Sequence, residues 1–275
     1  MTLATLRDVL QPALSEGRAI AGFVCLGWED ARAYARAAQT VGVPVILQAG
    51  PGCREHTPLP VLGAMFRILA ADVDVPVVAH LDHGYQAAEC REAIDAGFTS
   101  VMFDGSKLPL EENIAQTRAI AEMAHAAGVS CEGEIGFVGY AAGAESRGTD
   151  PEEAARFASE TGVDAMAISV GNVHLQTDAG DGLDEAKIAA IQAKTSVPLV
   201  IHGGSGVPHA QRGRLARETS ICKFNIGTEV RQVFGASLRQ VLADDPDQFD
   251  RVQILRRVEA PIQAAAEAVL RSLVS

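Results

Sequence analysis

The stretch that decides the fold is Val75-Pro76-Val77-Val78-Ala79-His80-Leu81-Asp82-His83-Gly84, an apolar run that ends in polar residues. The apolar part, residues 75–81, predicts a buried strand. The Ala- and Glu-rich residues 87–96 predict a helix that ends at Gly97, because glycine readily adopts the left-handed C-cap conformation. A second apolar run follows at 100–104. This order predicts one βα unit of a parallel sheet.

The same unit repeats along the chain. Apolar runs predict eight strands, at residues 20–26, 43–48, 75–81, 100–104, 130–135, 165–169, 199–202 and 221–226. Helical segments lie between them, at residues 28–40, 87–96, 110–127, 151–161, 184–194 and 209–217. The sequence has no GxGxxG motif and no Walker A loop that would favour an open doubly wound sheet. Eight units in 275 residues therefore predict an α/β fold, a closed (β/α)₈ TIM barrel.

Two further helices are predicted after the eighth strand, at residues 229–244 and 252–273, with a polar connection at 244–250. We expect this tail to serve packing or subunit contact. No low-complexity tract or linker divides the chain, so residues 1–275 are predicted to form a single domain. The Gly- and Ala-rich stretch 139–149 predicts a mobile loop.

Composition limits what the protein can bind. Hydrophobic residues make up 48% of the chain and charged residues 21%, which predicts a folded globular protein. The formal charge is −12, from 23 Lys and Arg against 35 Asp and Glu. A chain this acidic is repelled by nucleic-acid phosphates and anionic membranes, so we expect neither as a partner.

The cysteines and the N-terminal residues indicate the compartment. The five cysteines are odd in number, show no CxxC spacing and mostly lie in apolar runs, so we expect reduced thiols. The first residues lack an apolar leader, and no apolar stretch is long enough to span a membrane. These features predict a soluble, cytoplasmic protein.

Polar residues gather at the carboxyl ends of six consecutive predicted strands, where barrel enzymes build their active face. The segments are 80–84, 104–106, 132–134, 171–174, 202–206 and 225–229. They contain groups that bind a metal, move a proton or hold an anion. We therefore expect one active site at this face.

Three histidines at these strand ends, His83, His174 and His202, suit Zn²⁺, which three neutral imidazoles hold with one position left for substrate. A strand cap or a bond to a carboxylate is the alternative for any one of them. His80, two residues before Asp82, shares its side of the strand and is expected to point into the barrel beside the metal ligands. His56, His125 and His209, which lie in helices or loops, are interpreted as structural.

Four carboxylates accompany these histidines. Asp82 directly precedes a proposed ligand and could exchange a hydroxyl proton of the substrate or, alternatively, orient His83. Glu132, Glu134 and Asp104 are either further metal ligands or hydrogen-bond acceptors for imidazole N–H groups. The sequence does not separate these two roles.

Two Gly-rich turns follow the seventh and eighth predicted strands. They are Gly203-Gly204-Ser205-Gly206 and Gly227-Thr228. Barrel enzymes commonly bind phosphate at these two strand ends through backbone N–H groups and a hydroxyl. The turns therefore predict a phosphate site, with simple tight turns as the alternative.

Five segments together form a specific pattern, at residues 75–84, 97–106, 108–114, 202–206 and 223–229. They include Glu111-Glu112-Asn113, which no metal or phosphate argument singles out. The pattern resembles the class II, metal-dependent ketose-bisphosphate aldolases, the family of fructose- and tagatose-bisphosphate aldolases. The resemblance covers most of the chain.

The resemblance implies a zinc-dependent aldolase that reversibly cleaves a ketose phosphate between C3 and C4 to dihydroxyacetone phosphate and an aldehyde. Another divalent metal in place of Zn²⁺, and an additional monovalent cation, are also compatible with it. By the same resemblance the site residues are His83, His174 and His202 as ligands, Glu134 and Asp104 as carboxylates near the metal, Asp82 as acid/base, Gly203, Ser205, Gly227 and Thr228 at the phosphate, and Asn225 at the donor half. A homodimer or homotetramer that acts on a small sugar phosphate is expected.

The chain departs from the family pattern in its substrate pocket. Leu175-Gln176-Thr177 stand where the family has a Gly and soon an aromatic residue, and loop 137–148 offers only Glu145 as the residue that exchanges the C3 proton. The family's Asp-Pro-Arg, whose Arg grips the second phosphate, is shifted here to Phe249-Asp250-Arg251. Arg54 is an alternative cation for that phosphate. A ketose 1-phosphate or an atypical acceptor aldehyde is therefore also expected.

Two other functions are compatible with the sequence. Lys223, one of four lysines, could form a Schiff base with a ketose, although an ion pair at the barrel mouth is the plainer interpretation. The chain could also be a non-catalytic metal-binding sugar-phosphate sensor or a partner subunit, because loop 137–148 is so poor in acidic residues.

Overall fold

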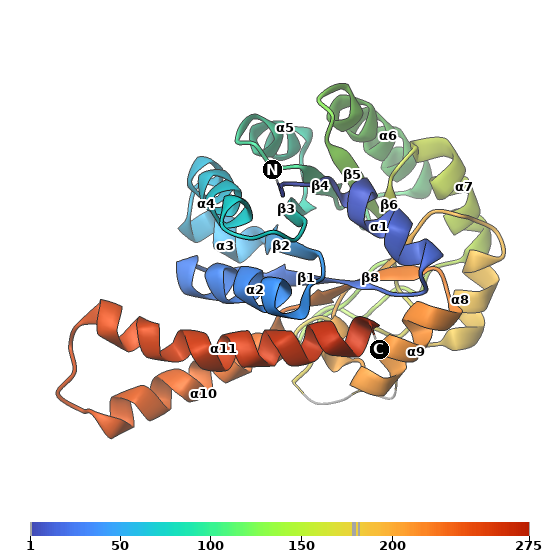
Figure 1. Ribbon diagram of the computed structural model, residues 1–275. Helices are drawn as coiled ribbons and strands as arrows, with labels where there is room; N and C mark the ends of the chain where they lie inside the picture. Colours follow the sequence, from blue (N-terminus) through green and yellow to red (C-terminus); the bar gives the residue numbers. More distant parts are fainter. Residues whose placement is uncertain (1, 178–179, 181, 275) are drawn as a thin grey trace.

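The computed structural model describes residues 2–177, 180 and 182–274. Eight parallel strands close into a barrel in chain order (Figure 1). They are β1 (Ile20–Val24), β2 (Val45–Ala49), β3 (Val77–Gly84), β4 (Ser100–Phe103), β5 (Ser130–Ile135), β6 (Ala165–Ile168), β7 (Leu199–Ile201) and β8 (Ile221–Ile226). The predicted TIM barrel is confirmed.

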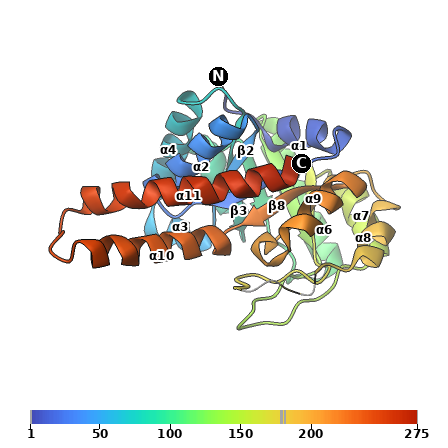
Figure 2. The same cartoon turned by 60° about the horizontal axis from the view of Figure 1, so that its bottom comes forward.

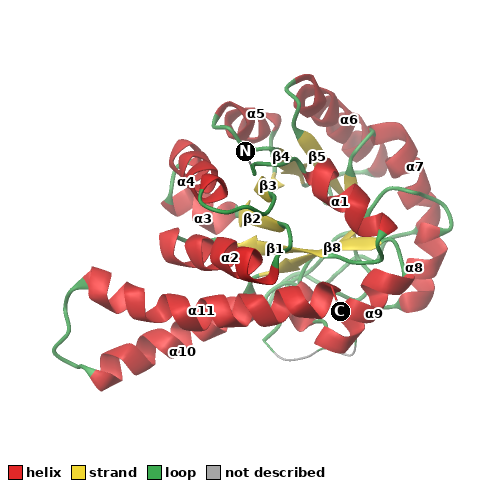
Figure 3. Cartoon of the chain, viewed as in Figure 1, coloured by secondary structure: helices red, strands yellow, loops and turns green. Residues whose placement is uncertain are grey.

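Helices surround the barrel, as the colouring by secondary structure shows (Figure 3). They are α1 (Leu6–Ser15), α2 (Trp28–Val41), α3 (Pro51–His56), α4 (Leu59–Ala71), α5 (Ala87–Asp95), α6 (Leu110–Ala126), α7 (Pro151–Thr161), α8 (Glu185–Gln192), α9 (His209–Glu218), α10 (Thr228–Asp244) and α11 (Arg251–Val274), with a short 3₁₀ turn at Gly204–Gly206. Gly97, which follows α5, has a φ of +90°, as expected of a glycine that ends a helix, and Gly42 and Gly162 end α2 and α7 in the same left-handed conformation.

The first helix, α1, closes the amino-terminal end of the barrel. Thr5 and Asp8 form a capping box at its start. Its apolar face packs Leu6 and Leu10 against the inward-facing residues at the beginnings of the strands, such as Val78. This contact keeps water out of the lower barrel, so access to the interior is from the carboxyl ends of the strands.

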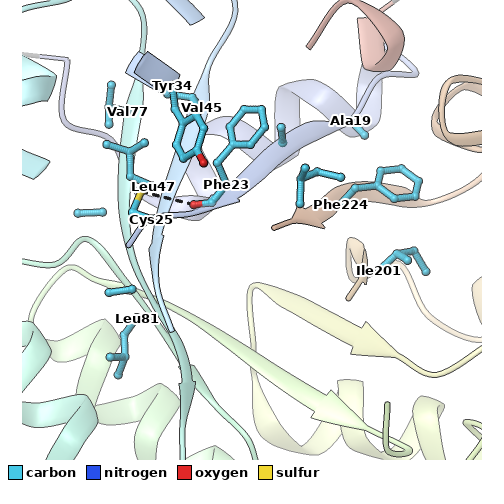
Figure 4. Packing of buried hydrophobic residues seen from close by; sticks show 14 of the residues in the cluster. Ala19, Phe23, Cys25, Tyr34, Val45, Leu47, Val77, Leu81, Ile201 and Phe224 are labelled. Carbon is cyan, nitrogen blue, oxygen red and sulfur yellow. Dashed lines mark hydrogen bonds between the residues drawn. The ribbon is translucent and has the colours of Figure 1, made fainter. Parts of the chain in front are cut away.

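The main core lies between the strands and the outer helices. Phe23 of β1 stacks on Tyr34 of α2 with ring centroids 4.6 Å apart. Figure 4 shows these two rings beside Val45 and Leu47 of β2. Full burial of such side chains contributes about 1.5–3 kcal/mol each, which holds the strand ends rigid beneath the site.

The last two helices form an arm. The antiparallel pair α10 and α11 extends beyond the barrel wall, and both views show it projecting (Figures 1 and 2). From Val258 onward, α11 packs into the main core, through Val258, Ile262 and Val269 among others. At the tip, Phe249 is 92% exposed. The two helices predicted after the eighth strand are thus present.

Some local features differ from the expectations. Helix α3, which follows β2, had not been predicted, and Pro51 occupies its first turn, where a missing N–H costs nothing. Strand β3 runs to Gly84 instead of ending at residue 81, with an irregular register between Leu81 and Gly84. Helices α1 and α4 had not been predicted.

The loop expected to be mobile, 139–149, is held by main-chain hydrogen bonds. Phe137 and Arg147 pair across its base at 2.8 Å in both directions. The Arg147 guanidinium also donates to the Ser106 carbonyl at 2.8 Å. The loop is therefore a closed turn fixed to its neighbours.

No helix in the described part of the chain is long and apolar enough to cross a membrane. The five cysteines, Cys25, Cys53, Cys90, Cys131 and Cys222, are all buried free thiols, as the sequence predicted.

Candidate active site

A cavity of about 430 Å³ opens at the carboxyl ends of the strands. It is lined by residues that follow β1, β2, β3, β6, β7 and β8, and by Tyr140 of the loop after β5. Three predicted site residues line it: the metal ligands His83 and His174 and the acid/base Asp82. Residues of the predicted polar strand ends therefore border this cavity.

The structure brings His83, His174 and His202 together. One ring nitrogen from each lies within 4.8 Å of the others, and the ring centroids are 4.7 to 5.6 Å apart. His83 reaches this position from a backbone with φ of +52°, which an L residue adopts only at a cost. The irregular end of β3 thus turns His83 toward the other two histidines.

Carboxylates fix the orientation of two of the rings. His83 Nδ1 lies 2.8 Å from Asp104 Oδ2, and His202 Nε2 lies 3.0 Å from Glu132 Oε1. Such bonds set which ring nitrogen keeps its lone pair for a metal. The sequence did not decide whether Glu132 is a metal ligand or a hydrogen-bond acceptor. In the structure it is a hydrogen-bond acceptor for an imidazole.

Two buried polar atoms beside the rings lack a hydrogen-bond partner among the described residues. They are His202 Nδ1 and Glu134 Oε2, which are 3.6 Å apart. Leaving such atoms without a partner is costly. A divalent cation held by the three imidazoles would satisfy both, so the residues present fit a metal ion. A second compatible set is His83, Asp104 and Glu134, whose ligand atoms also lie within 4.8 Å.

The charges around the site favour a cation. Burial opposes a charged His83 imidazole, but Asp82, Asp104 and Glu134 outweigh burial and raise its pKa to about 9. Burial, together with the charge of His83, lowers the pKa of His174 to about 3 and that of His202 well below its usual value. His174 and His202 are thus neutral and ready to ligate.

The neighbouring carboxylates also differ from one another. Burial and the charge of Asp104 raise the pKa of Glu134 to about 8. Burial would also raise the pKa of Asp104, but the hydrogen bond and charge of His83 and the bonds from Ser106 lower it below its usual range. Asp104 is therefore the carboxylate that stays ionised next to His83.

Asp82 faces the cavity from the end of β3. Its Oδ1 accepts a hydrogen bond of 3.2 Å from Asn225 Nδ2 on β8. Its other oxygen lies over Gly50, where an added Cβ would come within 3.4 Å. Asn225 thus holds one carboxylate oxygen and leaves the second toward the open space.

The two predicted phosphate turns meet at the start of α10. The N–H groups of Gly227 and Glu229 donate to Ser205 Oγ, at 3.2 and 3.4 Å. Gly203 has a φ of +63°, and a Cβ there would lie 2.2 Å from the Val173 carbonyl oxygen. Ser205, Gly227 and Thr228 line the cavity with Gly203, so an anion would find helix-terminal N–H groups there.

Below the histidines lies a second polar layer, and all its members are fully buried. Lys223 Nζ is 2.6 Å from Glu132 Oε2 and 3.4 Å from His80 Nε2. His80 Nδ1 is 2.8 Å from Ser100 Oγ. Lys223 is thus the cation of a buried ion pair and does not line the cavity, which removes the support for a Schiff base.

Three expected residues lie away from the main cavity. Glu145 lines a separate hollow with Ala144 and Ser146. The Arg54 guanidinium is bound to the carbonyls of Ala49, Asp82 and His83 and to Glu89. Arg251 begins α11 at the tip of the arm. None of the three is placed to meet a ligand in the main cavity of its own chain.

Three functional side chains that line the cavity were not predicted from the sequence. Arg231 lies one turn after Thr228 on α10, and its buried Nε has no hydrogen-bond partner among the residues that the structure describes. Tyr140 stacks on His174 with ring centroids 5.0 Å apart, and Tyr85 lies near His83 at 6.5 Å. Two signals in the sequence could have identified two of them. Arg231 lies three residues after Thr228, and Tyr140 is a lone aromatic residue in a Gly- and Ala-rich loop.

Burial is the first cause that raises the pKa of both phenols. For Tyr140 the carboxylates Asp104, Glu134 and Asp82 add to it, and for Tyr85 the same effect comes from Asp104, Tyr140 and Asp82. Both phenols therefore face the acidic centre of the site.

Known proteins are similar to this chain in both fold and sequence. The family model of class II fructose-bisphosphate aldolase matches residues 4–275. The chain is 37% identical over 279 residues to a 6-phospho-5-dehydro-2-deoxy-D-gluconate aldolase from Shouchella clausii (98% of this chain, 94% of that protein). It is 35% identical over 278 residues to a fructose-bisphosphate aldolase from Geobacillus stearothermophilus (98% and 96%). The crystal structure of the YdjI aldolase from Escherichia coli K12 matches with a TM-score of 0.86 at 30% identity, over 98% of this chain and 97% of that one.

Proposed function

Because the chain belongs to the class II fructose-bisphosphate aldolase family and is an aldolase, we propose that it cleaves a ketose 1-phosphate reversibly between C3 and C4 with the help of a bound divalent metal. Breaking that bond in any 2-ketose 1-phosphate gives dihydroxyacetone phosphate and an aldehyde. The observation that carries the proposal is that three imidazoles converge, and that two of them, His83 and His174, line a cavity that also contains Asp82 and a helix-terminal anion site.

We assign the metal to His83, His174 and His202, with Zn²⁺ as the expected ion and Glu134 and Asp104 as nearby carboxylates. A divalent ion bound there supplies Lewis-acid chemistry, because it polarises a ketone and stabilises the negative charge that develops on its oxygen. Glu132 supports this assignment, since its bond to His202 Nε2 leaves Nδ1 for the ion. A monovalent cation near the phosphate is a further part of the proposal.

Asp82 is assigned the proton of the C4 hydroxyl. A carboxylate removes that proton as the C3–C4 bond breaks and returns it in the condensation direction. Asn225 supports this role because it holds Asp82 Oδ1 and thereby aims Oδ2 at the cavity. Asn225 also lines the cavity beside the phosphate turns, where the donor half of the substrate would lie.

The phosphate is assigned to Gly203, Ser205, Gly227 and Thr228. The N–H groups at the start of the 17-residue helix α10 carry a partial positive charge. In the described chain those of Gly227 and Glu229 bond only weakly to Ser205 Oγ. A phosphate oxygen is a stronger acceptor for them than a hydroxyl.

The far end of the substrate is proposed to carry a carboxylate instead of a second phosphate. Among the described residues that line the cavity, Arg231 is the single Lys or Arg. A guanidinium suits the two oxygens of a carboxylate, while Arg54 is engaged by carbonyls and Arg251 lies at the arm tip. The relatives named 6-phospho-5-dehydro-2-deoxy-D-gluconate aldolase have a substrate of this type, with one phosphate and one carboxylate.

We further propose a homodimer or homotetramer in which the arm contacts a second copy. Phe249 and Val252, near the tip, are 92% and 55% exposed. Exposed apolar side chains on a projecting element favour contact with another protein surface. Five buried free thiols support a reducing compartment such as the cytoplasm.

The test is a cleavage assay with coupled detection of dihydroxyacetone phosphate. Fructose 1,6-bisphosphate and 6-phospho-5-dehydro-2-deoxy-D-gluconate are compared before EDTA, after EDTA and after zinc is restored. We expect activity that disappears and returns, with a higher kcat/KM for the second substrate. His202→Ala should lose both zinc and activity. Zinc-loaded protein that binds the substrates and cleaves neither would favour the sugar-phosphate sensor.

A further inference from the structure

Cleavage between C3 and C4 leaves a second proton transfer to be accounted for. C4 leaves as an aldehyde, and C3 keeps the electron pair of the broken bond as the enediolate of dihydroxyacetone phosphate. That carbon must gain a proton before the product is complete. Asp82 is held by Asn225 on the side of the barrel formed by β3 and β8, so a donor on the opposite wall would reach the other face of the enediolate.

Few described groups in the cavity carry a proton that a carbon can accept. His83, His174 and His202 are assigned to the metal, and one ring nitrogen each of His83 and His202 is bound to a carboxylate. Cys53 lines the cavity, but it is only 2% exposed, and burial raises the pKa of its thiol to about 11. Hydroxyls of Ser and Thr are far weaker acids than a phenol, which has a reference pKa of about 10. The remaining candidates are the phenols of Tyr85 and Tyr140.

Tyr140 is the phenol on the opposite wall. It belongs to the loop after β5, whereas Tyr85 follows β3 directly and lies on the same strand end as Asp82. The Tyr140 ring is stacked on His174 at 5.0 Å with an angle of 28° between the planes. The Tyr85 ring is 6.5 Å from His83. Tyr140 is thus placed against one of the three imidazoles, with its side chain 40% exposed at the cavity mouth.

The main chain fixes Tyr140 in that position. Its neighbours pair with the His174 segment, since the Ala141 N–H donates to the His174 carbonyl at 3.0 Å and the His174 N–H donates to the Gly139 carbonyl at 2.8 Å. The Gly139 N–H donates to Ser146 Oγ at 2.9 Å. A Cβ at Gly139 would lie 2.2 Å from the Ala144 carbonyl oxygen, so the turn closes tightly around Tyr140.

The same turn directs Glu145 elsewhere. Tyr140 lines both the main cavity and the neighbouring hollow that contains Glu145. The tyrosine side chain therefore stands between the main cavity and the acidic residue that the sequence had suggested for C3. Glu145 lines only the neighbouring hollow and does not reach the main cavity lining.

We infer that Tyr140 is the catalytic residue that transfers the C3 proton, an inference that rests on the proposed aldolase function. In the cleavage direction the phenol O–H bond breaks and the electron pair of the enediolate forms the new C3–H bond. The phenolate then takes a proton from water at the cavity mouth. In the condensation direction the phenolate removes the same proton from C3 of dihydroxyacetone phosphate.

The experiment follows this proton without any aldehyde. Zinc-loaded protein is mixed with dihydroxyacetone phosphate in D₂O, and the loss of the C3 proton signal is followed by NMR. We expect Tyr140→Phe to exchange this proton about 10²-fold more slowly, with unchanged zinc content and an unchanged KM in the cleavage assay. Tyr85→Phe, the matched control, and Glu145→Gln should keep the exchange rate of the unmodified protein.

The outcomes separate this inference from the proposed function. If the unmodified protein exchanges the proton and Tyr140→Phe does so at the same rate, the inference is wrong and the aldolase function stands. Loss of zinc from Tyr140→Phe would also overturn it, because the ring would then act by supporting His174. If Glu145→Gln alone slows the exchange, Glu145 is the donor. If the unmodified protein neither exchanges nor cleaves, the proposed function itself fails.

Discussion

Replacing Lys223 by methionine tests the buried layer beneath the three histidines. Lys223 Nζ lies 2.6 Å from Glu132 Oε2, and both side chains are fully buried. Methionine has a similar length and no charge, so the variant leaves the Glu132 carboxylate in the barrel with His202 as its remaining donor. Removing one partner of a buried ion pair typically costs about 3–5 kcal/mol.

The size of the loss can be bounded through protonation. Without its cation, Glu132 can avoid carrying a buried charge by taking a proton. Protonating a carboxyl with a reference pKa of about 4.3 costs about 1.4 kcal/mol per pH unit above that value, hence about 4 kcal/mol at pH 7 and about 1 kcal/mol at pH 5. In the variant the folded state would then bind more protons than the unfolded state, so stability relative to the unmodified protein rises as the pH falls.

The assay is urea denaturation in EDTA at pH 5, 6 and 7, so that metal binding adds nothing to either protein. Lys223→Met combined with Glu132→Gln is the matched control. Glutamine still accepts from His202 Nε2 and leaves no buried charge, so most of the loss and its pH dependence should disappear. A loss below about 1 kcal/mol at pH 7, which is typical of exposed pairs, or a loss equal at pH 5 and pH 7 would refute the reasoning.

Three further predictions concern the site itself. Asp82→Ala should keep its zinc while kcat falls about 10²-fold or more, because a group that moves a proton is lost; metal analysis with steady-state kinetics checks this, and normal turnover would exclude the role. Arg231→Met should raise KM about 10- to 100-fold for a substrate with a distal carboxylate, as expected for one charged hydrogen bond, and should leave KM unchanged for a ketose 1-phosphate without that charge. Gly203→Ala should lower Tm by several degrees, because φ is +63° and the new Cβ would lie 2.2 Å from the Val173 carbonyl oxygen. Gly128→Ala is the control and should lower Tm less, because φ is +73° but nothing lies within 4 Å of the new Cβ. Equal shifts in Tm would show that the close contact does not matter.

The barrel was predictable because its signals are local. Each apolar run followed by a helical segment and a glycine has one compatible arrangement, and eight in succession close a barrel. The site's face was predictable for the same reason, since strand ends such as Asp82-His83 follow their strands directly. The polar strand ends predicted one site, and the described residues His83, His174 and His202 do lie close together at the strand ends.

Helices α1 and α4 were less visible. Pro12 lies inside α1, which disfavours a helix by local rules. Its stability comes from packing Leu6 and Leu10 on the barrel end, and that contact involves strands far along the chain. Helix α4 is almost entirely apolar and therefore lacks the alternation of polar and apolar faces from which a surface helix is recognised.

The direction of long side chains was decided by the tertiary structure alone. The sequence does not distinguish Arg54 from Arg231. In the structure Arg54 is hydrogen-bonded to three carbonyls and Glu89, whereas Arg231 lines the cavity. Likewise, Glu145 and Tyr140 share one loop, and the closing of that turn sends the phenol to His174 and the carboxylate to another hollow. Periodicity and motif order depend on neighbours in the chain, so the sequence determined the barrel and its active face. Which charges meet depends on contacts between distant segments, which only the folded chain sets.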